Sequence, residues 1–110
     1  MDHEKQSDVL KSLVRTLEEL TASRLSVIEA SRQISAARFA LRQEQNPLFL
    51  PFVGIDSETD AFPIGAVRDL WASDALELYD RKREVAEQLY LPRALEAAAP
   101  LLEWSRSNVP

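Results

Sequence analysis

The chain has 110 residues, of which 45% are hydrophobic, and a formal net charge of −5. This length fits one small domain that buries roughly two-thirds of its surface, and the composition is that of a globular protein. The absence of cysteine excludes disulfides and thiolate metal sites and fits a reducing, cytoplasmic compartment. The acidic balance disfavours nucleic acid as a partner, and we expect no secretory signal and no membrane contact.

Leucines at three- and four-residue spacings predict a helix over residues 7–21. This spacing places them on one face, while charged residues fall on the outward side. The apolar face consists of Leu10, Leu13, Val14, Leu17 and Leu20. We therefore expect the helix to pack along one side, and nothing in it indicates catalysis.

A second helix is predicted over residues 26–43, and the motif S-x-x-E marks its start. In this capping box the hydroxyl of Ser26 accepts a hydrogen bond from a free amide of the first turn, and the carboxylate of Glu29 accepts one from the amide of the cap residue. A narrow stripe of small and apolar residues would let a neighbouring helix come close: Val27, Ala30, Ile34, Ala37 and Leu41. Arginines make this helix the basic side of the protein: Arg24, Arg32, Arg38 and Arg42.

Residues 46–65 are predicted to form a long, ordered loop. Pro47 and Pro51 favour extended geometry for themselves and for the residues before them, which argues against a helix. The only glycines of the chain, Gly54 and Gly65, also lie here. A brief strand over residues 48–55 is an alternative, but it would lack a pairing strand. Apolar side chains should pin the loop to the helices, and loops of this length are often functional.

A short helix is predicted over residues 65–71 and a long one over residues 73–104, with Ser73 as its cap. Apolar residues of the long helix include Leu76, Tyr79, Val85, Leu89 and Tyr90. Pro92 and Pro100 interrupt it, so we expect either a break near residue 91 or a kinked continuation. The sequence thus predicts a single all-α domain: a small antiparallel bundle of three long helices, the last one kinked or split.

The residues offer little for catalysis or for a cofactor. The single histidine is His3, there is no cysteine nucleophile, and the G-x-S-x-G, P-loop and G-x-G-x-x-G motifs are missing. We therefore predict no catalytic residue, no cofactor and no resident metal.

Three acids at alternate positions, Asp56, Glu58 and Asp60, match the first ligand positions of a calcium loop. The match fails at Ala61, where glycine is required, and at Val67, where the closing glutamate is required. There are two other interpretations. In the structural one, the acids accept hydrogen bonds from backbone amides or pair with an arginine, and in the other they contact a partner protein. For the structural interpretation the pairing arginines would be Arg68 or one from the second helix, such as Arg38.

Residues 52–71 carry the pattern F-x-G-I-D-S-E-T-D followed by P-x-G-x-x-R-x-x-W. It is formed by Phe52, residues 54–60, Pro63, Gly65, Arg68 and Trp71. This pattern resembles a signature of small bacterial helical proteins of uncharacterised activity, and covers about a fifth of the chain. Proteins of this size and type are often immunity proteins of bacterial toxins. The resemblance implies no catalytic residue.

Three hypotheses follow. The first is a non-enzymatic, cytoplasmic protein-binding module, most concretely an immunity protein that blocks a toxin domain. Its contacts would be Asp56, Glu58 and Asp60, with Phe49 or Phe62 as an anchor. The second is a structural homodimer or scaffold protein that pairs through the small-residue stripe of the second helix. The third is a metal-dependent enzyme. In each, five residues shape the fold: Gly54, Gly65, Arg68, Trp71 and Arg38.

Overall fold

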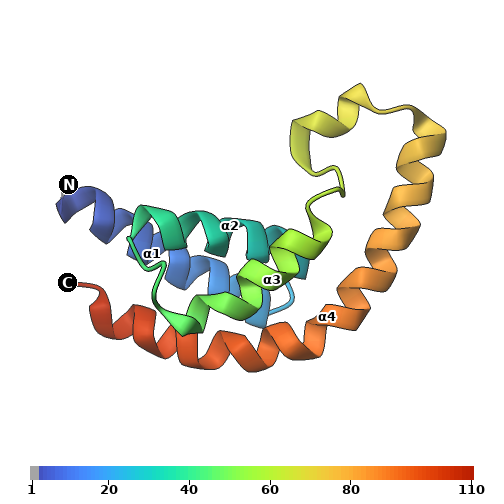
Figure 1. Cartoon of the computed structure of the whole chain (residues 1–110). Helices are drawn as coiled ribbons and strands as arrows, with labels where there is room; N and C mark the ends of the chain where they lie inside the picture. The colour runs from blue at the N-terminus through green and yellow to red at the C-terminus, as the bar shows by residue number, and fades with distance from the viewer. Residues whose placement is uncertain (1–2) are drawn as a thin grey trace.

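The computed structural model describes residues 3–110, and all regular structure in them is helical. The all-α prediction is therefore confirmed (Figure 1). The elements in chain order are α1 (His3–Thr21), α2 (Val27–Ala40), the 3₁₀ helix η1 (Pro47–Phe49), α3 (Leu50–Thr59), the 3₁₀ helix η2 (Gly65–Leu70) and α4 (Ser73–Asn108).

The first two helices follow the predicted patterns, with small shifts at their ends. Helix α1 begins four residues earlier than predicted, and its leucines Leu13, Leu17 and Leu20 are buried. Helix α2 has Ser26 as its N-cap, and the N–H of Glu29 donates to the Ser26 hydroxyl at 3.1 Å. It ends before residue 43 because Arg42 adopts a left-handed conformation with φ of 55°.

The prediction of a non-helical loop over residues 46–65 is wrong, because ten of these residues form helix α3. Pro47 and Pro51 stand in the first turns of η1 and α3. There the missing N–H costs nothing, since the first amides of a helix have no partner within it. Asn46 caps η1 and accepts from the N–H of Leu48 at 3.1 Å. Within the described residues the bundle thus has four α-helices, one more than predicted.

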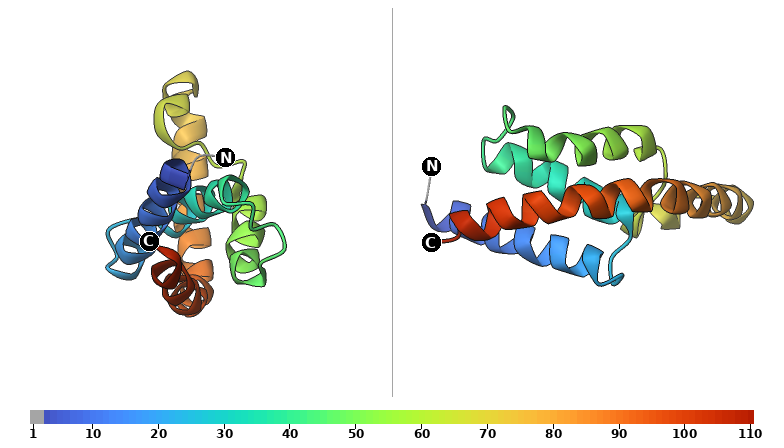
Figure 2. Two further views of the ribbon diagram at one scale, coloured as in Figure 1. Left: turned by 90° about the vertical axis from the view of Figure 1, so that its left-hand side faces the viewer. Right: turned by 90° about the horizontal axis from the view of Figure 1, so that it is seen from below.

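One hydrophobic core joins α1, α2, α3 and the C-terminal half of α4. Figure 2 shows these elements side by side, with the start of α1 and the end of α4 at the same end of the molecule. Helix α3 contributes Phe52 and Ile55, and η1 contributes Phe49, all three without exposed surface. The buried core residues of α4 begin at Ala94, and the partly buried Tyr90 packs against the same core. The two aromatic side chains bury the largest volumes, so they account for much of the hydrophobic stabilisation.

Helix α4 is continuous through Pro92 and Pro100 and runs beyond residue 104. Of the two predicted alternatives the break is therefore absent, which leaves the kinked continuation. Figure 1 shows that it bends strongly in its orange part, before the stretch that packs on the bundle. A proline kinks a helix over the preceding turn, which matches this place for Pro92. The radius of gyration is 14.7 Å, against about 13 Å for a compact chain of this length.

The bend turns the N-terminal half of α4 away from the core. We call residues 64–89, which comprise η2 and this half of α4, the arm. No residue between 64 and 93 is fully buried. The arm is therefore attached to the bundle by surface contacts and not by the main core.

Candidate functional site

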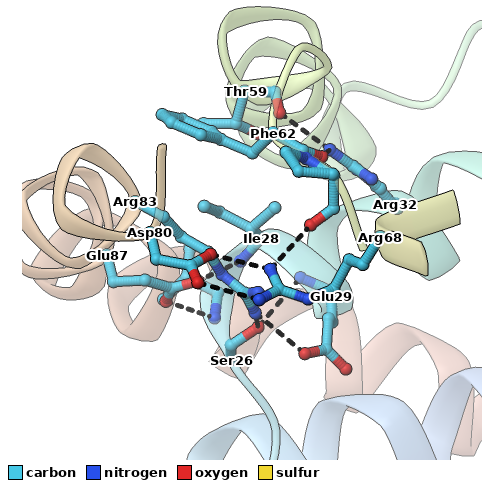
Figure 3. Close-up of polar contacts among 12 residues, drawn as sticks. Ser26, Ile28, Glu29, Arg32, Thr59, Phe62, Arg68, Asp80, Arg83 and Glu87 are labelled. Atoms are coloured by element: carbon cyan, nitrogen blue, oxygen red, sulfur yellow. Dashed lines mark hydrogen bonds and ion pairs between the residues drawn. The ribbon is translucent and has the colours of Figure 1, made fainter. Parts of the chain in front are cut away.

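The junction between the arm and the bundle is held by charged side chains from α4 (Figure 3). The carboxylate of Glu87 accepts from the N–H groups of Val27 and Ile28, at 2.8 and 3.0 Å. These are free amides of the first turn of α2, where a negative charge is also favoured by the helix dipole. Glu87 therefore completes the cap of α2 from a position about sixty residues further along the chain.

A second contact joins α4 to the same end of α2. The guanidinium of Arg83 donates to the carboxylate of Glu29 at 2.9 Å and to the hydroxyl of Ser26 at 3.3 Å. The capping box predicted from the sequence is thus only half formed, because the carboxylate of Glu29 binds Arg83.

Within the arm, η2 is fixed to α4 by a two-pronged ion pair. Arg68 donates from both terminal nitrogens to Asp80, at 2.7 and 2.8 Å, and also to the carbonyl of Pro63 at 3.4 Å. The hydrogen bonds from Arg68 lower the pKa of Asp80, and those to Asp80 raise the pKa of Arg68. This geometry is the preferred one between arginine and a carboxylate, and it holds η2 in one orientation.

A cavity of about 470 Å³ lies beside these contacts. Its lining residues are Arg68, Asp80, Arg83, Glu84, Glu87 and Gln88. Both arginines and two of the three acids are already paired with each other, with α2 or with the amides described above. None of the buried side-chain atoms that lack a hydrogen bond in the described residues lines this cavity. The cavity therefore offers a ligand little uncompensated charge.

The three acids predicted to contact a partner have different environments. Asp56 lies 3.9 Å from Arg32, and Glu58 accepts a hydrogen bond from the hydroxyl of Tyr90, which raises the pKa of that phenol. Asp60 is exposed just after α3. The structure places these acids on and beside a helix, not on a loop, and two of them have partners within the chain.

The two predicted anchors, Phe49 and Phe62, are also separated by the fold. Phe49 has no exposed surface and packs edge-on against Trp104, so its prediction as a contact for another protein is wrong. Phe62 is half-buried and meets Tyr79 edge-on at 6.1 Å. Trp71 meets the same ring at 5.1 Å. Tyr79 therefore lies between two aromatic rings and fixes the arm to the end of the bundle.

Several predicted structural residues have definite roles. Gly65 has φ of +73°, a conformation that favours glycine, whereas Gly54 is an ordinary helical residue of α3. Arg38 donates to the carbonyl of Glu44 and lies over the ring of Phe39, so it pairs with none of the three acids.

Sequence reasoning missed the role of Arg32. Its guanidinium donates to the carbonyls of Thr59 and Phe62, at 2.8 and 2.6 Å. Thr59 is the last residue of α3 and Phe62 lies just beyond it, so neither carbonyl has a partner within the helix, although the carbonyl of Thr59 also accepts from the N–H of Phe62 at 3.2 Å. Arg32 thus caps α3 from α2.

The exposure of several apolar side chains on the arm was also not predicted from the sequence. Leu70 is 85% exposed, Val85 66% and Leu89 69%, although the last two were interpreted as ordinary apolar residues of the long helix. Leu78 is 46% exposed. We call Leu78, Val85 and Leu89 the apolar stripe.

The small-residue stripe of α2 is unavailable for pairing with a second chain. Ala30, Ile34 and Ala37 are buried inside the bundle, as are the other members of the stripe. The predicted homodimer contact through α2 is therefore wrong.

No group of three or more acidic, histidine or cysteine side chains within the described part of the chain could hold a metal ion. Among residues 3–110 no helix is long and apolar enough to cross a membrane. No protein-family description, curated protein or solved structure matches this chain.

Proposed function

We propose that this protein acts by binding another protein, without catalysis, and that the arm carries the contact surface. The observation that supports this most directly is the exposure of Val85 and Leu89, at 66% and 69%, on a helix that projects from the core. Grouped apolar side chains that remain in water usually mark an interaction surface.

The attachment of the arm favours the same function. Arg83 and Glu87 bind the start of α2, and Arg68 binds Asp80 within the arm. These contacts hold the stripe in a fixed orientation before a partner arrives, which reduces the ordering cost of association.

The resemblance described above suggests a more specific form of this function, a cytoplasmic immunity protein that binds a toxin domain. In that role Asp60, and Asp56 and Glu58 after release from Arg32 and Tyr90, would attract a basic cleft. An alanine triple variant of the three acids should then bind a toxin partner more weakly at low salt. Unchanged affinity and salt dependence would remove the acids from the interface.

Site-specific photo-crosslinking tests the general proposal. A photoreactive amino acid at position 85 should give one discrete cross-linked product in the producing cells. The same group at position 50 is a matched control, because Leu50 is also an exposed apolar residue, at 51%, but lies on α3. The same products from both positions, or none from position 85, would contradict a binding surface on the arm.

A further inference from the structure

The apolar stripe runs along the side of α4 that faces away from the bundle. At 3.6 residues per turn, Leu78, Val85 and Leu89 lie within about 40° of one another around the helix axis. Arg83 and Glu87, which bind α2, lie about 140° or more from Leu78. Figure 1 shows the outer side of the bend free of other elements. A second helix can therefore approach the stripe without meeting the bundle.

The spacing of the stripe is that of a helix-pairing seam. Positions 78, 82, 85 and 89 alternate steps of four and three residues, the pattern by which two α-helices pack along each other. Lys82 is the single charged residue of this seam. In a parallel pair Lys82 would face its own copy, and the two like charges would repel each other. An antiparallel pair avoids this contact.

In one antiparallel alignment every residue of the seam has a partner on the second helix. With the two-fold axis between residues 83 and 84, Leu78 faces the partner's Leu89, and Lys82 faces the partner's Val85. The aliphatic stem of Lys82 can cover Val85 while its ammonium group stays over the ring of Tyr79, beside the seam. Each apolar residue of the stripe then meets an aliphatic group, and the same contacts occur twice because the pairing is symmetric.

The residues beside the seam fit the same alignment. Arg81 and Gln88 are exposed on one flank of α4, about 20° apart around the helix axis. In the antiparallel pair Arg81 is level with residue 86 of the partner, about 3 Å along the axis from Gln88 of the partner. Arg81 can therefore donate to the side-chain amide oxygen of that Gln88, and the contact occurs twice in the symmetric pair.

We propose that the partner of the arm is a second copy of this chain, bound antiparallel through the stripe of Leu78, Val85 and Leu89. This inference rests on the proposed function, since it names the partner of the same surface. The seam spans only a few turns, so the contact belongs to the small class of interfaces, and we expect a reversible dimer. The two bundles would lie on opposite sides of the paired arms.

The first test is the mass in solution by sedimentation equilibrium. Wild-type protein should approach twice the chain mass of 12.4 kDa as its concentration rises. Val85→Glu should remain a monomer, while the control Leu50→Glu should dimerise as wild type does. Circular dichroism checks that both variants keep their helices. A wild-type monomer at about 1 mM, where even a Kd of 1 mM would show, would overturn the proposal.

Disulfide trapping measures the orientation, which is convenient because the chain has no cysteine. Leu78→Cys mixed with Leu89→Cys should cross-link several-fold faster than either variant alone. In the antiparallel pair two identical positions of this kind lie about 16 Å apart along the axis, and a disulfide needs Cα atoms within about 7 Å. Faster cross-linking of Leu78→Cys alone would instead show a parallel pair.

These results distinguish the inference from the function on which it rests. Wild-type monomers together with a product from position 85 that contains a different protein would refute self-pairing and leave the binding surface intact. No product at position 85 and no dimer would refute both. A product of twice the chain mass would support both.

Discussion

Replacing Glu87 with alanine is expected to lower the free energy of unfolding by about 2 kcal/mol. Glu87 accepts two amide hydrogen bonds, at 2.8 and 3.0 Å, from buried residues at the start of α2. Bonds to a charged acceptor contribute roughly 1.5–3 kcal/mol each. The cavities beside Glu87, of about 470 and 370 Å³, admit water that can replace part of this loss. The expected cost is therefore below the sum of two such bonds.

Thermal unfolding followed by circular dichroism measures this effect. For a domain of this size, 2 kcal/mol corresponds to a fall in Tm of about 8 °C. Glu87→Gln keeps one oxygen acceptor and should cost about half as much. The control is Glu77→Gln, an exposed residue of the same helix, which should change stability by less than about 0.5 kcal/mol. If Glu87→Ala were no less stable than this control, the capping of α2 by α4 would be wrong.

Three further changes test other parts of the structure. Gly54→Ala should stabilise by about 0.5–1 kcal/mol, because the added Cβ lies 3.7 Å from Arg93 and glycine is unfavourable within a helix. Gly65→Ala should destabilise by about 1–2 kcal/mol, because φ there is +73°; urea unfolding that gave both changes the same sign would contradict this assignment. The pKa of Asp80 is lower in the folded chain than in the unfolded chain. As the pH falls, the unfolded chain therefore takes up a proton at a higher pH than the folded chain, and the free energy of unfolding decreases below about pH 4. Asp80→Asn should reduce this loss of stability at low pH, as measured by urea unfolding, and an unchanged pH dependence would contradict the role of Asp80.

The helical character was predictable because α1, α2 and α4 carry their apolar residues at helical spacing. Helix α3 was missed because proline was taken to exclude a helix, whereas Pro51 stands in the first turn. The buried residues Phe52, Ile55 and Thr59 have helical spacing, so the sequence did hold the signal.

The environment of the candidate site was less predictable. Contacts such as Arg83 with Glu29 and Glu87 with the amide of Val27 join residues more than fifty positions apart. No local pattern identifies such pairs. The exposure of Val85 also depends on the bend of α4, since in a straight packed helix an apolar residue at that position would be expected to face the core.

The separation of the arm from the core divides the sequence into parts under different constraints. Side chains that fill a core must match one another in volume, but no residue between 64 and 93 is fully buried. Residues on the outer side of this segment can therefore be substituted without compensating changes in the interior. Related chains could keep one framework and diverge in what they recognise simply by altering the surface of this projecting hairpin of η2 and α4.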